Sequence, residues 1–468
     1  SMIGVISIPV FTNLFPPDEY GIYSMVISGI LLTSNILTGW LANSAFRFYD
    51  EYKNKNKETT YFTTIFTTLF IINSAVVILG VISFTLFNNF FYEYKFIFLF
   101  SLLILISAPF MKLTKKILRA NRDINIYSFL TILLPIGKLG LVLLFNQYVS
   151  FLGVSMLLIA TFLTETIIVL IALKRLKPDL KISYFNKNFF VKLFKYGFPL
   201  MFTSILIWVL SVSDRYIIGF LRSSEEVGLY SIAYTIGKKS LYLVFMMLML
   251  AAYPVIIKAW INHDKDYVEL LLNQLIKYFY ILTIPTLTAL FVLSPMLMSI
   301  LSSPEYYEGY RVIPWVSLGL FFMSLSQYVF KIWELKENTK IIMYTNLIAA
   351  VINLLLNLLL VNKFGYIAAG ISTFVSYFIY CMIAINLTKD EINLSLLNSD
   401  TYKIVLSALL MLIPVYIMNR ILEYKIFSFI LIVFSGAVFY FILLYIFGVI
   451  KKEAIILIDA IRGWPLRL

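Results

Sequence analysis

The sequence contains little cysteine, histidine or charge. Of its 468 residues, one is Cys, one is His and only 13% are charged, yet the formal net charge is +13. The single Cys381 excludes an internal disulfide and a thiolate metal cluster. The single His263, in a polar stretch, excludes the paired histidines of HExxH zinc sites and argues against a His-based catalytic triad. We therefore expect no metal, no cofactor and no enzyme.

Apolar residues are abundant instead and make up 61% of the chain. Soluble proteins have about a quarter of their residues charged, whereas a membrane-crossing helix needs about 20 largely apolar residues. Runs of that length recur from end to end, so the sequence predicts an all-α, polytopic membrane protein with about 14 transmembrane helices. We place them at residues 1–15, 20–46, 60–87, 95–112, 124–146, 149–173, 197–221, 226–257, 275–301, 311–333, 340–361, 365–387, 403–419 and 425–449.

The two halves of the chain contain an internal repeat. The pattern Glu-x-Gly-x-Tyr-Ser occurs at 19–24 and again at 226–231, around Gly21 and Gly228. An offset that spans six helices returns each repeat to the same side of the membrane, so the repeats are parallel. We expect two lobes of six helices around a central cavity, followed by two C-terminal helices. The domains are 1–173, with a first span that looks truncated, a connector at 174–196, then 197–387, 403–449 and a tail at 450–468.

Charge in the loops predicts the orientation. Most of the 38 Lys and Arg residues follow even-numbered spans or lie in the tail. By the positive-inside rule, both termini are cytoplasmic. The connector at 174–196 combines cations with Phe side chains and is interpreted as an amphipathic helix on the inner leaflet. Ordinary contact of loop cations with lipid phosphates explains the same pattern. The net charge therefore reflects topology, and no nucleic-acid partner is expected.

Several short segments of the chain stand out by their order and spacing: PPDEYGIY at 16–23, FRFYDE at 46–51, DRYII at 214–218, EVGLYS at 226–231, NLLLN at 353–357 and GYIAAGI at 365–371. Together they resemble a known family, the polysaccharide or O-antigen-unit (Wzx-type) flippases of the multidrug/oligosaccharidyl-lipid/polysaccharide (MOP) exporter superfamily. The resemblance implies a bacterial cytoplasmic-membrane transporter of a lipid-linked oligosaccharide, surrounded by membrane lipids. It also implies a coupling ion, H⁺ or Na⁺, and contacts with polysaccharide-assembly proteins.

Six ionisable side chains fall inside the predicted spans, where each costs about 2.5–3.5 kcal/mol on insertion scales and suggests a function. Arg47, at the inner end of the second span, is a borderline seventh. The candidates for binding an anionic substrate are the cations Arg47, Lys138, Arg215, Lys238 and Lys239. The candidates for ion coupling or counter-charge are the acids Glu165 and Asp214.

Each candidate has a structural alternative. Lys238 or Lys239 could pair with Asp214, and because adjacent helix residues point about 100° apart, at most one of the two lysines faces the cavity centre. Arg215 could bind a phosphate or reach the outer headgroups, and Lys138 has the same ambiguity. Glu165 could be protonated and silent, or could bind the coupling ion.

Cations exceed acids within the spans, so the sequence predicts an anionic cargo. A diphosphate-linked oligosaccharide fits this, and we expect it to be flipped from the inner to the outer leaflet by alternating access. A lipid II flippase and a multidrug or cation exporter of the same superfamily remain the alternatives. A membrane glycosyltransferase or polymerase fits less well, because such enzymes usually have a large outer loop and the outer connections here are short.

Overall fold

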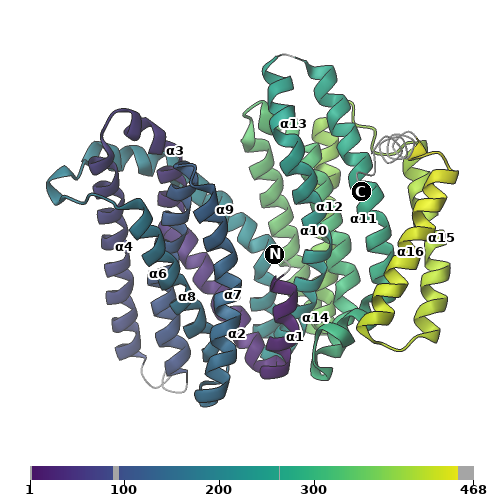
Figure 1. Ribbon diagram of the computed structural model, residues 1–468, viewed down its shortest axis with the longest axis horizontal. Coiled ribbons are helices and arrows are strands. Elements are labelled where there is room, and N and C mark those ends of the chain that lie inside the picture. The colour runs from purple at the N-terminus through teal and green to yellow at the C-terminus, as the bar shows by residue number, and fades with distance from the viewer. Residues whose placement is uncertain (1–2, 88–93, 263, 452–468) are drawn as a thin grey trace, which may run out of the picture. The chain divides into compact units, whose positions relative to one another are not determined.

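The computed structural model describes residues 3–87, 94–262 and 264–451 (Figure 1). Every regular element in these ranges is helical, which confirms the predicted all-α fold. The chain divides into two compact units, Ser1–Gly228 and Leu229–Leu468. His263 and nearly all of the predicted tail at 450–468 lie outside the described residues.

The described residues of the first unit form eight α-helices and the first turn of a ninth, and their apolar side chains pack in separate clusters. The helices are α1 (Ile3–Leu14), α2 (Pro17–Ser34), α3 (Trp40–Asn54), α4 (Glu58–Leu86), α6 (Lys95–Ala120), α7 (Ile124–Tyr148), α8 (Ser155–Leu176) and α9 (Lys187–Leu221). A π-helical turn, Asn35–Gly39, joins α2 to α3 without a break in direction.

The second unit begins inside α10 and has one large apolar core. Its helices are α10 (Ser224–Ile261), α11 (Lys265–Leu301), α12 (Ile313–Val329), α13 (Lys331–Leu335), α14 (Thr339–Thr388), α15 (Ser399–Ile421) and α16 (Ile426–Ile446). The last two pack on each other, and α15 packs along α11.

The number of membrane crossings agrees with the prediction. Within the described ranges, twelve helices are long and apolar enough to cross a membrane. One of them, α14, has 50 residues and is interrupted at Gly365, whose φ of 64° and ψ of −158° are not helical. It therefore supplies the two crossings predicted at 340–361 and 365–387. With the short helix α1 the total matches the predicted count of about 14.

Several helix boundaries differ from those predicted, since α9 and α11 begin about ten residues early and α3 ends late, and two further differences bear on the site. The fourth span, predicted to end at Lys112, continues in α6 to Ala120, because Lys, Leu and Arg are good helix formers and charge alone does not end a helix. The helix predicted over 174–196 is not continuous. The chain leaves α8 at Lys177, which has a positive φ of 43° and precedes Pro178, and α9 begins only after its N-cap Asn186.

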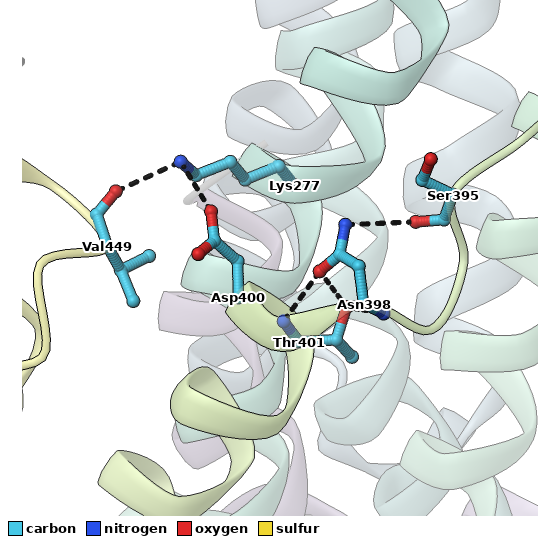
Figure 2. Close-up of polar contacts among 6 residues, drawn as sticks. All are labelled: Lys277, Ser395, Asn398, Asp400, Thr401 and Val449. Carbon is cyan, nitrogen blue, oxygen red and sulfur yellow. Dashed lines mark hydrogen bonds and ion pairs between the residues drawn. The ribbon is translucent and has the colours of Figure 1, made fainter.

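Polar contacts around the start of α15 hold the last two helices, α15 and α16, in place (Figure 2). Lys277 of α11 forms an ion pair with Asp400 at 3.0 Å and donates a hydrogen bond to the Val449 carbonyl at 2.9 Å. Asn398 caps α15, because its side-chain oxygen accepts a hydrogen bond from the Thr401 backbone N–H at 2.9 Å. One lysine therefore ties α11 to both ends of the α15–α16 pair.

The repeated glycines make a reciprocal backbone contact. A Cβ atom on Gly21 would lie 1.8 Å from the Ser224 carbonyl oxygen, and one on Gly228 would lie 1.9 Å from the Pro17 carbonyl oxygen. Each glycine thus faces the residue four positions before the other, as equivalent positions of a repeat should. Only glycine allows the first turns of α2 and α10 to approach so closely.

This contact predicts that Gly21→Ala lowers the thermal stability of the protein. The added methyl group meets backbone rather than a flexible side chain, so the cost should reach or exceed the roughly 1–3 kcal/mol typical of overpacking. The control is Gly140→Ala, because no atom lies within 4 Å of the Cβ position there. In thermal unfolding of detergent-purified protein, Gly140→Ala should equal or exceed the wild type. Equal melting temperatures for the two variants would contradict the close contact.

Candidate functional site

Two of the candidate residues, Lys138 and Glu165, lie close together within the first unit. Lys138 of α7 donates a hydrogen bond to the Tyr23 hydroxyl of α2, and its ammonium group lies 4.5 Å from the centre of the Tyr23 ring. The Phe11 ring of α1 is 5.2 Å from the same ammonium group. The cation is therefore held by aromatic rings and a hydroxyl, an arrangement that compensates part of its lost hydration.

Glu165 of α8 is buried, with 5% of its surface exposed. Its carboxyl group accepts a hydrogen bond from the Ser107 hydroxyl of α6 at 2.5 Å. Glu165 and Lys138 attract each other electrostatically, although no ion pair within 4.0 Å joins them. Sequence reasoning considered these two residues separately and missed Tyr23 and Ser107, which connect them to α2 and α6.

Asp214 and Arg215 lie on α9 and are both buried, at 0% and 8% exposed. The Arg215 guanidinium donates a hydrogen bond to the Ser211 carbonyl at 3.2 Å. Two aromatic side chains on the same helix fasten it to α2. Trp208 donates to the Ser28 carbonyl at 3.0 Å and Tyr216 to the Met25 carbonyl at 2.6 Å. These contacts fix where the Asp214–Arg215 pair lies in the first unit.

Lys238 and Lys239 lie on α10 in the second unit. Lys238 is exposed, and its ammonium group is 6.0 Å from the ring centres of Tyr234 and Tyr242, one turn before and after it. Lys239 is half-buried. The two lysines thus have different surroundings, as their adjacent positions on a helix require.

Arg47 lies on the exposed side of α3. Its guanidinium carbon is 5.8 Å from the centre of the Phe48 ring. Among the residues that the structure describes, no carboxylate lies within ion-pair distance of Arg47. Arg47 is therefore available at the surface of α3, and within the described ranges no hydrogen bond or ion pair joins it to Lys138 or Glu165.

Sequence reasoning also missed three cations on α6, because it ended that span at Lys112 and counted the later cations as loop residues. Lys112, Lys116 and Arg119 follow one another at spacings of four and three, so they share one helix face. We call these three residues the α6 cationic face. Lys112 donates a hydrogen bond to the Asn35 side-chain oxygen. The Phe46 ring lies 5.5 Å from the Lys116 ammonium group and 5.7 Å from the Arg119 guanidinium carbon.

The described part of the chain contains no group of three or more His, Cys, Asp and Glu side chains that could hold a metal ion. The polar chemistry of both units therefore consists of cations, hydroxyl groups, aromatic rings and a few buried acids. Such groups can bind and neutralise an anion, especially a phosphate, through charge-assisted hydrogen bonds.

Sequence comparison connects the chain to polysaccharide biosynthesis. The family model described as polysaccharide biosynthesis protein matches residues 1–260, and the MatE model matches residues 199–359. An uncharacterized membrane protein of Methanocaldococcus jannaschii, MJ1068, is 26% identical over 203 residues, which are 43% of this chain and 39% of that protein. The chain thus matches about two fifths of the length of this relative.

Solved structures of transporters have a similar fold. The lipid II flippase MurJ, in an inward closed conformation, aligns with a TM-score of 0.79 over 97% of both chains at 18% identity. An inward-facing multidrug resistance transporter of the MATE family aligns with a TM-score of 0.65 over 83% of this chain and 93% of that one, at 12% identity. At these identities the likeness concerns the fold. Since the polysaccharide biosynthesis model covers more than half of the sequence, the chain belongs to that family, within the MOP superfamily of flippases and exporters.

Proposed function

We propose that this transporter flips an anionic, undecaprenyl-diphosphate-linked oligosaccharide from the inner to the outer leaflet by alternating access. One observation carries the proposal, namely that cations in the membrane-crossing helices outnumber acids. In the interiors of the spans the cations are Lys138, Arg215, Lys238 and Lys239 and the acids are Glu165 and Asp214, while Arg47 and the α6 cationic face add cations toward the ends of α3 and α6. The match to the polysaccharide biosynthesis family supports a sugar-bearing cargo.

The chemistry of such a cargo explains the need for these cations. A diphosphate cannot enter hydrocarbon without replacement of its water, and charge-assisted hydrogen bonds from Lys and Arg supply that replacement. A guanidinium group also binds a phosphate through two N–H groups at once. The burial of Arg215, at 8% exposed, favours phosphate binding over contact with outer headgroups. The polyprenyl tail stays in the lipid while the charged part crosses the membrane within the protein.

The orientation and the connector belong to the same proposal. We infer that the protein lies in the bacterial cytoplasmic membrane with both termini inside, as the distribution of loop cations indicates. Backbone N–H groups of the connector at 174–196 donate to threonine hydroxyls of α4, from Lys181 to Thr63 and from Asn186 to Thr64, each at 3.1 Å. Ile182, between them, is 86% exposed. Such a fixed segment with an exposed apolar side chain fits contact with the inner leaflet.

A second cargo class has specific support. The MatE match at residues 199–359 and the fold of a multidrug resistance transporter favour export of an organic cation. Cation binding would call for acids facing the cargo, and here Glu165 already accepts a hydrogen bond from Ser107. Lipid II is a third cargo, suggested by the MurJ fold, and it shares the diphosphate that we propose the cations recognise.

The proposal predicts that Arg215→Ala, Lys238→Ala and Lys239→Ala each slow flipping of a lipid-linked oligosaccharide. A hydrogen bond to a charged group contributes about 1.5–3 kcal/mol, so losing one that forms during crossing should slow the rate roughly tenfold or more. The assay is accessibility of a fluorescent lipid-linked substrate to a membrane-impermeant quencher in proteoliposomes. The exposed Lys363→Ala serves as control. Wild-type rates in all three variants would rule out the cationic mechanism.

For Glu165 we propose the role of counter-charge to Lys138. Glu165 is buried and Lys138 half-buried, and removing either charge leaves the other less compensated, so Glu165→Gln and Lys138→Met should each lower the melting temperature. The double variant should be more stable than the sum of the two single losses predicts, since neighbours couple by about 0.5–3 kcal/mol. Additive losses, together with flipping by Glu165→Gln that no longer depends on a H⁺ or Na⁺ gradient, would identify Glu165 as an ion-coupling site instead.

A further inference from the structure

The α6 cationic face gathers three cations on one side of a helix without an acidic partner among the described residues. Among the described residues, no carboxylate lies within 4.0 Å of Lys112, Lys116 or Arg119. Some other cations of the first unit are paired: Lys55 and Lys192 contact Glu51 at 3.0 and 2.7 Å, and Arg175 contacts Asp123 at 2.8 Å. The first unit therefore carries both neutralised and unneutralised cations.

Electrostatics makes this arrangement costly unless an anion arrives from outside. Like charges three and four residues apart on a helix repel each other. The helix C-terminus favours a cation in its last turn, which accounts for Arg119. It does not account for Lys112, which lies eight residues before Ala120, about 12 Å from the helix end. An anionic ligand would supply the missing counter-charge through charge-assisted hydrogen bonds.

The surroundings of Lys112 keep its ammonium group in place. It donates to the Asn35 side chain, and a Cβ atom on Gly39 would lie 3.3 Å from the Lys112 Nζ. Asn35 and Gly39 are the two ends of the π-helical turn between α2 and α3. Such turns are frequent at functional sites, since they shift side chains out of the regular helical pattern. Here the turn presents an amide oxygen and a residue without a side chain to one lysine.

Phe46 of α3 orients the other two cations. Its ring lies 5.5 Å from the Lys116 ammonium group and 5.7 Å from the Arg119 guanidinium carbon, and it is 40% exposed. A ring holds a cation without neutralising its charge, so both groups keep their affinity for an anion. The three cations extend over about 10 Å of helix, from the end of α6 into its membrane-crossing part.

We propose that the α6 cationic face, with Asn35 and Phe46, is a docking site for the diphosphate of the lipid-linked cargo on the inner-leaflet side. This inference rests on the proposed function. Arg119 and Lys116 meet the phosphates at headgroup level, and Lys112 draws them toward the interior of the first unit. The ligand chemistry is a lipid phosphate, which two sources share: the diphosphate of the cargo and the single phosphate of an anionic phospholipid.

The test measures binding of undecaprenyl diphosphate and of phosphatidylglycerol to the full-length purified protein by native mass spectrometry. The variants are Lys112→Gln, Lys116→Gln and Arg119→Gln, with Arg119→Lys to keep the charge without the forked donor. Lys115→Gln is the matched control, because Lys115 lies on the same helix but faces the Tyr127 ring at 5.6 Å. A variant whose melting temperature is similar to that of Lys115→Gln is taken as folded.

We expect each of the three glutamine variants to weaken undecaprenyl diphosphate binding about tenfold or more, and Arg119→Lys to weaken it less. Flipping in proteoliposomes should slow in the same order. If the three glutamine variants bind and flip the diphosphate lipid as well as Lys115→Gln does, the docking site is overturned. The proposed function would still stand in that case, provided that the wild type flips the lipid. Loss of phosphatidylglycerol binding alone would also overturn it, by making this a phospholipid site. A wild type that neither binds nor flips the diphosphate lipid would overturn the proposed function itself.

Discussion

The cost of placing a charge in hydrocarbon is the constraint on which the arrangement of this protein depends. Each ionisable side chain inside a span must find polar partners within the protein or the cargo. In the first unit the Tyr23 hydroxyl accepts a hydrogen bond from Lys138, and Ser107 donates one to Glu165. Such contacts compensate part of the hydration that these charges lose. The α6 cationic face has no carboxylate partner among the described residues, and the same constraint makes it informative about the cargo.

Backbone packing sets the frame in which these charges are held. Helices in a membrane gain little from burying apolar surface against one another, so close approach and hydrogen bonds between them matter more. The crossing at Gly21 and Gly228 brings two backbones together, while Trp208 and Tyr216 of α9 donate to carbonyl groups of α2. These contacts fix α2, the helix that carries Tyr23 and continues through the π-helical turn to α3. The lysines of α6 and α7 thus meet partners on one continuous segment.

The sequence predicted the fold well because spans of a membrane protein are encoded locally, by the length of apolar runs. Even the break at Gly365 follows from the two separate runs around it. Hydropathy, however, marks only where the hydrocarbon of the membrane ends. The helix α6 continues past that point, because Lys, Leu and Arg are good helix formers. The cations after Lys112 were therefore assigned to a loop. The proximity of Lys138 to Glu165 could not be predicted either, because it depends on how α7 and α8 face each other. The binding and coupling roles of the candidate residues stay predictions.

The central claim is that the cargo is a lipid-linked anion and not an organic cation. The most direct test is transport by the wild-type protein in proteoliposomes, with an undecaprenyl-diphosphate-linked oligosaccharide and ethidium measured in parallel. The excess of cations over acids in the spans predicts that the diphosphate lipid is flipped faster than in protein-free liposomes and that ethidium is not moved. Movement of ethidium without flipping of the diphosphate lipid would contradict the account and favour a multidrug exporter.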